Sequence, residues 1–284
     1  MAAYREYTHK TRDGLSLYYR AYGPEESTRT PVLCLSGLTR NGRDFHELAL
    51  HLGRTRTVMC LDYRGCGRSD RDLDYMNYQV DTDAADVADL LDGIGVPEAI
   101  FMGTSRGGLT TMNLALTRLD LIAAAIMNDV GPALRKGGRG KVGKYFELPY
   151  AYPDWDAACA AYRAWSEKTT PDLNDARWMA RARATFVETK DGRVRFDFDP
   201  KMANAYRGRT DPPHSWAKFE ALMVKPVLSI RGEWSGILTA ETVEDMRARK
   251  PDLQALTVPN RGHTPLLDEP EAVAAIDAFL EDLP

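Results

Sequence analysis

The stretch that decides the fold runs from Ala99 to Gly108 and reads Ala-Ile-Phe-Met-Gly-Thr-Ser-Arg-Gly-Gly. Its first four residues are all apolar, as expected of a strand buried within a sheet, and a helix is predicted over residues 107–117. Between strand and helix, Gly103 and Gly107 flank Ser105 with the spacing G-x-S-x-G. The glycines permit a sharp turn that projects the serine hydroxyl at the edge of the sheet. Ser105 is therefore the candidate nucleophile; the alternative is a helix N-cap with no chemistry.

Strands and helices alternate on both sides of this turn. The predicted strands lie at 4–10, 15–22, 31–36, 56–61, 99–102, 122–128, 227–231 and 253–258, and the predicted helices at 44–53, 78–91, 107–117, 240–250 and 269–280. The first two strands should form an antiparallel hairpin. Strands that alternate with helices of this length predict an α/β fold with a mostly parallel sheet of about eight strands, flanked by helices.

Residues 133–222 interrupt the alternation. They contain helical pieces, six prolines and several aromatic residues, but little strand signal. The stretch 193–198 alternates apolar and polar residues, yet it is short and isolated. We therefore predict a core domain of residues 1–132 and 223–284, with residues 133–222 inserted as a helical cap over one end of the sheet. Aromatic residues of the cap are expected to shape a pocket or to pack the cap itself: Tyr145, Phe146, Trp155, Trp165 and Trp178.

Composition excludes several classes of protein. The net charge of -4, from 37 basic and 41 acidic residues, argues against a globally basic nucleic-acid binder. The longest apolar stretch is too short to cross a membrane, and no secretory signal is visible. Four cysteines without CxxC spacing favour reduced thiols in a cytoplasmic protein and argue against zinc. We expect a cytoplasmic monomer or homodimer.

A serine nucleophile needs a base, and five histidines are available. Only His263 follows a late strand at the edge of the sheet where the strands end. It also comes after Ser105 in the chain, the order expected when a strand-turn-helix serine pairs with a histidine. His263 is thus the candidate base; a structural or surface histidine in such a loop is the alternative.

At this point the chain resembles an α/β-hydrolase over nearly its whole length, in particular bacterial enol-lactone hydrolases and small-ester hydrolases. The stretches that carry the resemblance are 35–41 (LSGLTRN), 62–70 (DYRGCGRSD), 103–108 (GTSRGG), 128–132 (NDVGP) and 261–270 (RGHTPLLDEP). The resemblance implies an oxyanion hole formed by the backbone N–H groups of Leu38 and Arg106. It also implies that the stretch around Arg64 is structural, with Arg64 and Asp70 in ion pairs that hold the loop.

The acid of the triad is where this sequence departs from the family. Similar proteins carry Asp where Gly236 stands, so no carboxylate occupies the usual position. Asp129, at the end of the strand that follows the nucleophile helix, is the preferred candidate because an acid there could orient His263. Glu233 is the alternative acid, and a chain with no true acid is the third possibility. Asp129 could instead cap the turn that begins at Val130.

These residues predict a serine hydrolase that cleaves a small ester or lactone through an acyl-enzyme on Ser105, with His263 as general base. No metal and no organic cofactor are expected. Asp70, Asp72 and Asp74 resemble the start of a calcium loop, but Tyr75 stands where that loop needs glycine. Two alternatives stay open: carbon–carbon bond hydrolysis with the same serine, and a non-catalytic ligand-binding homologue, which the missing acid at Gly236 would explain.

The net charge divides unevenly along the chain. Residues 133–222 hold 17 basic and 12 acidic residues, a balance of +5, and the rest holds 20 against 29, a balance of -9. A basic cap could attract an anionic, carboxylate-bearing ester or lactone. Solvated helix faces, including those of Arg177, Arg181 and Arg183, are the simpler and preferred explanation.

Overall fold

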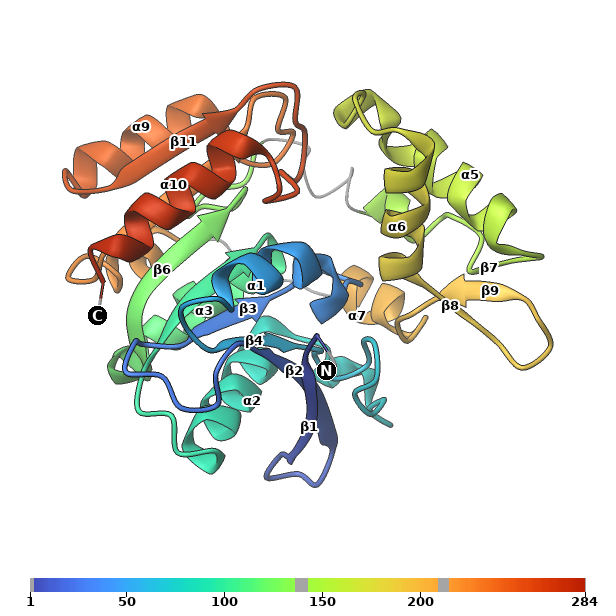
Figure 1. Cartoon of the computed structure of the whole chain (residues 1–284), viewed down its shortest axis with the longest axis horizontal. Coiled ribbons are helices and arrows are strands. Elements are labelled where there is room, and N and C mark those ends of the chain that lie inside the picture. Colours follow the sequence, from blue (N-terminus) through green and yellow to red (C-terminus); the bar gives the residue numbers. More distant parts are fainter. Residues whose placement is uncertain (1–2, 136–142, 209–214, 284) are drawn as a thin grey trace.

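The computed structural model describes residues 3–135, 143–208 and 215–283. Its centre is an eight-stranded sheet with the order β1-β2-β4-β3-β5-β6-β10-β11 (Figure 1). The strands are β1 (Arg5–Lys10), β2 (Ser16–Tyr22), β3 (Val32–Leu35), β4 (Val58–Leu61), β5 (Ala99–Thr104), β6 (Ile122–Asn128), β10 (Val227–Gly232) and β11 (Gln254–Val258). The pairs β1–β2 and β2–β4 are antiparallel, and the other neighbours are parallel. The predicted α/β fold with a mostly parallel sheet of about eight strands is confirmed.

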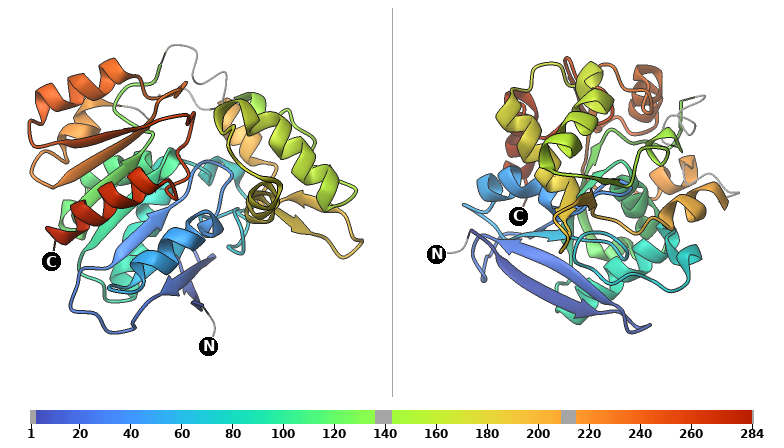
Figure 2. Two further views of the ribbon diagram at one scale, coloured as in Figure 1. Left: turned by 45° about the horizontal axis from the view of Figure 1, so that its top comes forward. Right: turned by 90° about the vertical axis from the view of Figure 1, so that its right-hand side faces the viewer.

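Helices cover both faces of this sheet (Figure 2). In β3, Val32 and Cys34 pack into one hydrophobic cluster, while Leu33 and Leu35 pack into the other. The first cluster is covered by α1 (His46–Leu52) and α10 (Pro270–Glu281), the second by α2 (Val80–Gly93), α3 (Arg106–Ala115) and α9 (Ala240–Arg249). Because both faces are buried, the central strands need apolar side chains at nearly every position, which explains their continuous apolar runs.

The segment between β6 and β10 has a third hydrophobic cluster, which includes Tyr152, Phe186 and Phe196. Its elements are β7 (Ala151–Tyr152), α5 (Trp155–Ser166), α6 (Asp175–Thr185), β8 (Phe186–Glu188), β9 (Val194–Phe196), α7 (Met202–Gly208) and α8 (Trp216–Glu220). Strands β7, β9 and β8 form a small antiparallel sheet. The prediction of a purely helical segment is wrong in this respect. Strand β9 lies in the stretch that appears isolated in sequence, because its two partners are too short to show a period.

The division into a core domain and a cap stays a prediction. Helix α8 packs with the sheet: Phe219 and Leu222 are fully buried in the same cluster as α3. Residues 136–142 and 209–214 of the predicted cap lie outside the described residues.

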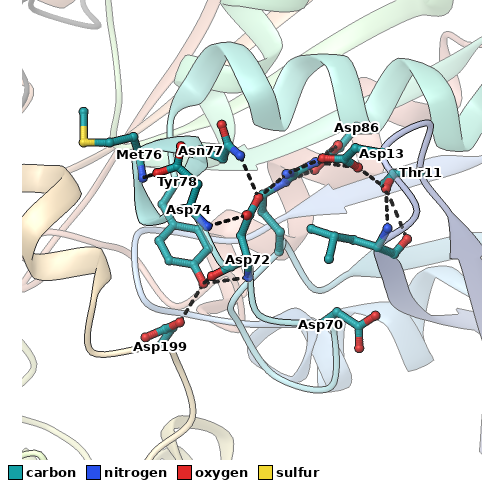
Figure 3. A network of polar contacts seen from close by, with 12 residues as sticks. Thr11, Asp13, Asp70, Asp72, Asp74, Met76, Asn77, Tyr78, Asp86 and Asp199 are labelled. Atoms are coloured by element: carbon teal, nitrogen blue, oxygen red, sulfur yellow. Dashed lines mark hydrogen bonds and ion pairs between the residues drawn. The ribbon is translucent and has the colours of Figure 1, made fainter.

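A buried arginine, Arg64, holds the loop after β4. Its carboxylate partners Asp13, Asp72 and Asp86 are labelled in Figure 3. Arg64 donates to Asp86 at 2.6 and 2.7 Å, to Asp72 at 2.6 Å and to Asp13 at 2.9 Å. Asp70, expected in an ion pair, instead accepts a hydrogen bond from the backbone amide of Ser16 at 2.8 Å. The acidic run that resembles a calcium loop therefore serves to bind a guanidinium and a backbone amide.

Tyr78 extends this network to the segment between β6 and β10. Its hydroxyl donates to Asp199 at 2.7 Å and accepts from the amide of Asp72 at 3.0 Å (Figure 3). Asp199 lies just before α7, so the loop after β4 is tied to that segment by polar contacts.

Replacing Arg64 with methionine is expected to lower the free energy of unfolding by about 3–5 kcal/mol at pH 8, because Asp72 and Asp86 then lose their buried cation. Burial already raises the pKa of Asp86 to about 6, against the opposing effect of Arg64, and the variant raises it further. An acid whose pKa is raised by folding stabilises the folded state more at low pH. The loss should therefore be smaller at pH 5 than at pH 8, as measured by urea unfolding.

Arg118→Met is the matched control for this prediction. Arg118 pairs with Asp92 and Asp120 at the surface, so its removal should leave the free energy of unfolding nearly unchanged. Equal losses in the two variants, or a loss in Arg64→Met that is the same at both pH values, would contradict the assigned role of Arg64.

Candidate active site

Ser105 lies at the tip of a sharp turn from β5 into α3. Its backbone has φ 50° and ψ -109°, a strained conformation for a residue with a side chain. The helix packs directly against the sheet at this turn. A Cβ on Gly107 would lie 2.0 Å from the carbonyl oxygen of Leu35, and one on Gly103 would lie 2.5 Å from the amide nitrogen of Gly108. The two glycines of the motif are therefore required for this close approach.

The hydroxyl of Ser105 faces His263. Ser105 Oγ lies 2.9 Å from His263 Nε2, although the two residues are 158 positions apart in the chain. His263 belongs to the loop after β11. The two predicted residues are thus brought within hydrogen-bond reach, the distance that proton transfer to a base requires.

Asp129 completes the arrangement from the end of β6. Its Oδ2 lies 2.6 Å from His263 Nδ1, and its side chain is fully buried. Its backbone, like that of Ser105, has a positive φ of 53°. The carboxylate points to His263 and the loop after β10, so capping of its own turn does not account for it.

The loop after β10 supplies further donors to Asp129. The amide of Gly232 donates to Oδ1 at 2.9 Å, and the hydroxyl of Ser235 donates to Oδ2 at 2.7 Å. Ser235 Oγ in turn accepts from the amides of Ile237 and Leu238 at 3.1 and 3.0 Å. Sequence reasoning missed Ser235, because nothing in this loop indicates which polar side chain faces a strand end far away in the chain.

The alternative acid lies elsewhere. Glu233 accepts a hydrogen bond from the backbone amide of Asn260 at 3.0 Å and is not brought to His263. Gly236, at the family's usual acid position, lines the cavity beside Ser105. The carboxylate that reaches His263 therefore comes from Asp129.

The two predicted oxyanion donors are backbone groups near Ser105. Leu38 lines the same cavity as Ser105 and His263, and Arg106 is the first residue of α3. Neither amide is bonded to another residue within the described part of the chain. The side chain of Arg106 is buried and donates to Asp83 at 2.6 Å. Burial opposes the charge on Arg106, but Asp83 raises its pKa above the ordinary value.

A cavity of about 330 Å³ opens over Ser105. Loops at the ends of β3, β5, β10 and β11 form one side, and side chains of α5 and α6 form the other. Of the five aromatic residues expected to shape a pocket, Tyr145, Trp165 and Trp178 line the cavity. The other two pack elsewhere: Phe146 against Phe198 and Tyr206, and Trp155 beneath Arg183.

Three charged side chains also line this cavity, namely Arg40, Asp44 and Arg181. The sequence does not distinguish Arg181 from its neighbours on α6. In the structure Arg177 pairs with Asp268, and Arg183 is exposed, whereas Arg181 is half-buried and faces the cavity.

The described residues include neither a metal-binding cluster nor a membrane-spanning helix. No group of three or more His, Cys, Asp or Glu side chains among them is placed to hold a metal ion. None of their helices combines the length and the apolar character needed to cross a bilayer.

Comparison with known proteins finds relatives along most of the chain. The model of the alpha/beta hydrolase family matches residues 32–276. The 3-hydroxybutyrate-oligomer hydrolase of Cupriavidus necator is 31% identical over 273 residues, which cover 92% of this chain and 91% of that protein. Esterase YbfF of Escherichia coli is 27% identical, over 90% of this chain and 95% of the esterase.

A solved structure is also similar over almost the full length. The crystal structure of an alpha/beta hydrolase from Novosphingobium aromaticivorans superposes with a TM-score of 0.93 at 40% identity, and 99% of each chain is covered. With a family model over most of its residues and hydrolase relatives along nearly its whole length, this chain belongs to the alpha/beta hydrolase family.

Proposed function

We propose that this protein is a serine hydrolase that cleaves a small carboxylic ester or lactone through an acyl-enzyme on Ser105. The observation that carries the proposal is the unbroken series of contacts from Ser105 to His263 at 2.9 Å and from His263 to Asp129 at 2.6 Å. A nucleophile, a base and a carboxylate that orients the base form the Ser-His-Asp arrangement. Ser105 and His263 both face the cavity, whose volume lies near the lower end of the usual range for small-molecule sites.

In the first half-reaction, Ser105 Oγ attacks the carbonyl carbon while His263 Nε2 takes the hydroxyl proton. The carbonyl oxygen becomes an oxyanion, for which the N–H groups of Leu38 and Arg106 are the candidate donors. His263 then gives its proton to the departing alkoxide oxygen. The bond between carbonyl carbon and alkoxide oxygen breaks, and the acyl group stays on Ser105.

In the second half-reaction, His263 takes a proton from water, and the resulting hydroxide attacks the acyl carbon. The bond to Ser105 Oγ breaks, and Ser105 regains its proton from His263. The products are a carboxylic acid and an alcohol, or one hydroxy acid when the substrate is a lactone. Each proton is taken up and returned by His263, so the steps balance without a cofactor.

Asp129 prepares His263 for both steps. Its carboxylate accepts a hydrogen bond from the Nδ1–H group of His263, which leaves the unprotonated Nε2 free to act as the base. The negative charge also stabilises the imidazolium that forms during each attack. Because the carboxylate is fully buried and held by Gly232 and Ser235, its position is defined before substrate arrives.

The relatives support an ester substrate by their names, since one is a 3-hydroxybutyrate-oligomer hydrolase and another an esterase. Both align with this chain over most of its length. Neither name identifies the substrate of this protein, because one fold serves many substrates.

A fluorophosphonate probe is expected to attach to Ser105 and to increase the mass of the intact protein by one label. Ser105→Ala should neither gain the label nor hydrolyse 4-nitrophenyl butanoate above background, because the attacking oxygen is gone. Heat-denatured wild-type protein is the control for nonspecific labelling. A folded wild-type protein that stays unlabelled, yet binds a small ligand tightly, would favour the non-catalytic homologue instead.

Asp129→Asn is expected to lower kcat for 4-nitrophenyl butanoate by about 10³–10⁴-fold, because the amide no longer holds His263 in the required tautomer. Glu233→Gln is the matched control and should keep kcat nearly unchanged, since Glu233 contacts the Asn260 amide rather than His263. The reverse pattern would transfer the role of the acid to Glu233.

Ser235→Ala is expected to lower kcat by roughly 10-fold with little change in KM, because Asp129 loses one of its hydrogen bonds. Ser235→Thr keeps a hydroxyl and should restore most of kcat. Ser229→Ala is the control, because Ser229 is also buried on β10 and its hydroxyl has no partner among the described residues. Similar losses in Ser229→Ala and Ser235→Ala would contradict the positioning role.

A further inference from the structure

The cavity over Ser105 contains an arginine that forms no ion pair with a carboxylate in the part of the chain that the structure describes. The charged side chains that line the cavity are those of Arg40, Asp44 and Arg181. Arg40 and Asp44 come from the region after β3, and Arg181 comes from α6. How these three charges are paired decides what the cavity can bind.

Arg40 and Asp44 neutralise each other. Arg40 Nε donates to Asp44 Oδ2 at 2.7 Å, and Nη2 donates to Oδ1 of the same carboxylate. The remaining Nη1 donates to the hydroxyl of Thr185. This bidentate ion pair neutralises the Arg40 guanidinium and leaves no net charge on the pair to be matched by a ligand.

Arg181 has no such partner. Its guanidinium forms no ion pair with any described residue, and it lies beside the Tyr162 hydroxyl. Its neighbours on α6 behave differently, since Arg177 pairs with Asp268 at the surface and Arg183 lies over the ring of Trp155. The three charged groups of the cavity therefore leave a net charge of one positive unit, located on Arg181.

The positive charge of Arg181 changes the pKa of the neighbouring Tyr162 hydroxyl. Burial by itself raises the pKa of the Tyr162 hydroxyl, yet the guanidinium groups of Arg181 and Arg40 bring that pKa below its ordinary value. The local potential in this part of the cavity is thus positive in spite of Asp44. The buried hydroxyl of Tyr145 also lines the cavity, beside the Arg40 guanidinium.

We propose that Arg181 binds a carboxylate of the substrate, so that the preferred substrates are esters carrying one negative charge a few bonds from the scissile ester bond. The inference rests on the proposed function, because it concerns substrate choice at Ser105. A planar guanidinium matches a carboxylate with two parallel hydrogen bonds. The single unmatched positive charge on Arg181 favours a monoanion.

The test compares esters that differ only in charge. One pair carries the group on the alcohol side, 3-(butanoyloxy)propanoate against 3-(butanoyloxy)propanamide. The other pair carries it on the acyl side, monomethyl glutarate against methyl 4-carbamoylbutanoate. For each pair the readout is the ratio of kcat/KM for the carboxylate to kcat/KM for the carboxamide. Because both values come from one protein sample, differences in the active fraction cancel.

Wild-type protein is expected to prefer the carboxylate by roughly 10- to 100-fold in at least one pair. Arg181→Met should bring that ratio close to one. Arg183→Met removes the same charge from the exposed side of α6 and should keep the ratio, which separates a site in the cavity from general attraction by a basic surface.

Ratios near one in both pairs for the wild type, or equal falls in Arg181→Met and Arg183→Met, would overturn the inference. Hydrolysis of 4-nitrophenyl butanoate in parallel reports on the proposed function itself, so its presence with ratios near one rejects only the carboxylate site.

If Arg181→Met does not fold, inhibition of the wild type decides the question. Butanoate should inhibit competitively at roughly 10-fold lower concentration than butanamide, and equal inhibition contradicts the proposal.

Discussion

The direct contact between helix α3 and the sheet is the constraint on which the site depends. Gly107 has no room for a Cβ against Leu35, and Gly108 has none against Val130, whose Cγ1 would lie 2.2 Å from it. The first turn of α3 therefore contacts both the end of β3 and the turn after β6. Any side chain at these glycines would push the strands or the turn away, and Ser105 would lose the strained backbone that projects its hydroxyl.

A second constraint is the buried charge of Asp129. A buried carboxylate is costly unless hydrogen bonds compensate for the lost water. Here Gly232, Ser235 and His263 all contact it, so the loops after β10 and β11 meet on the carboxylate at the end of β6. The contacts that make this charge tolerable in the interior are the same ones that orient His263. Stability and the geometry of the proposed active site are thus coupled at this residue.

Arg64 and Arg181 have different roles because their guanidinium groups have different partners. Arg64 is enclosed by Asp13, Asp72 and Asp86 and serves to hold a loop. Arg181 has a tyrosine hydroxyl beside it and no carboxylate among the described residues, and it faces the cavity over Ser105. Among the described residues of 133–222, Arg181 therefore differs from an exposed arginine such as Arg183, because its guanidinium makes the potential inside the cavity more positive.

The sequence alone determined the order of strands and helices, because buried parallel strands and amphipathic helices have distinct apolar periods. It also determined the turn at Ser105, since the flanking glycines are dictated by local geometry, and it singled out His263 by chain order. The sequence did not predict the small sheet around β9, because the partner strands β7 and β8 are too short to show an alternating pattern.

Only the tertiary structure decided which carboxylate lies against His263. The order β6-β10-β11 places the end of β6 beside the loops after β10 and β11, and strand neighbours are set by pairing rather than by distance along the chain. The positions of the Ser235 and Arg181 side chains could not be predicted from the sequence for the same reason. A polar residue in a loop, or one of several arginines on a polar helix, has the same local sequence whether it faces solvent or a cavity, and only packing makes the difference.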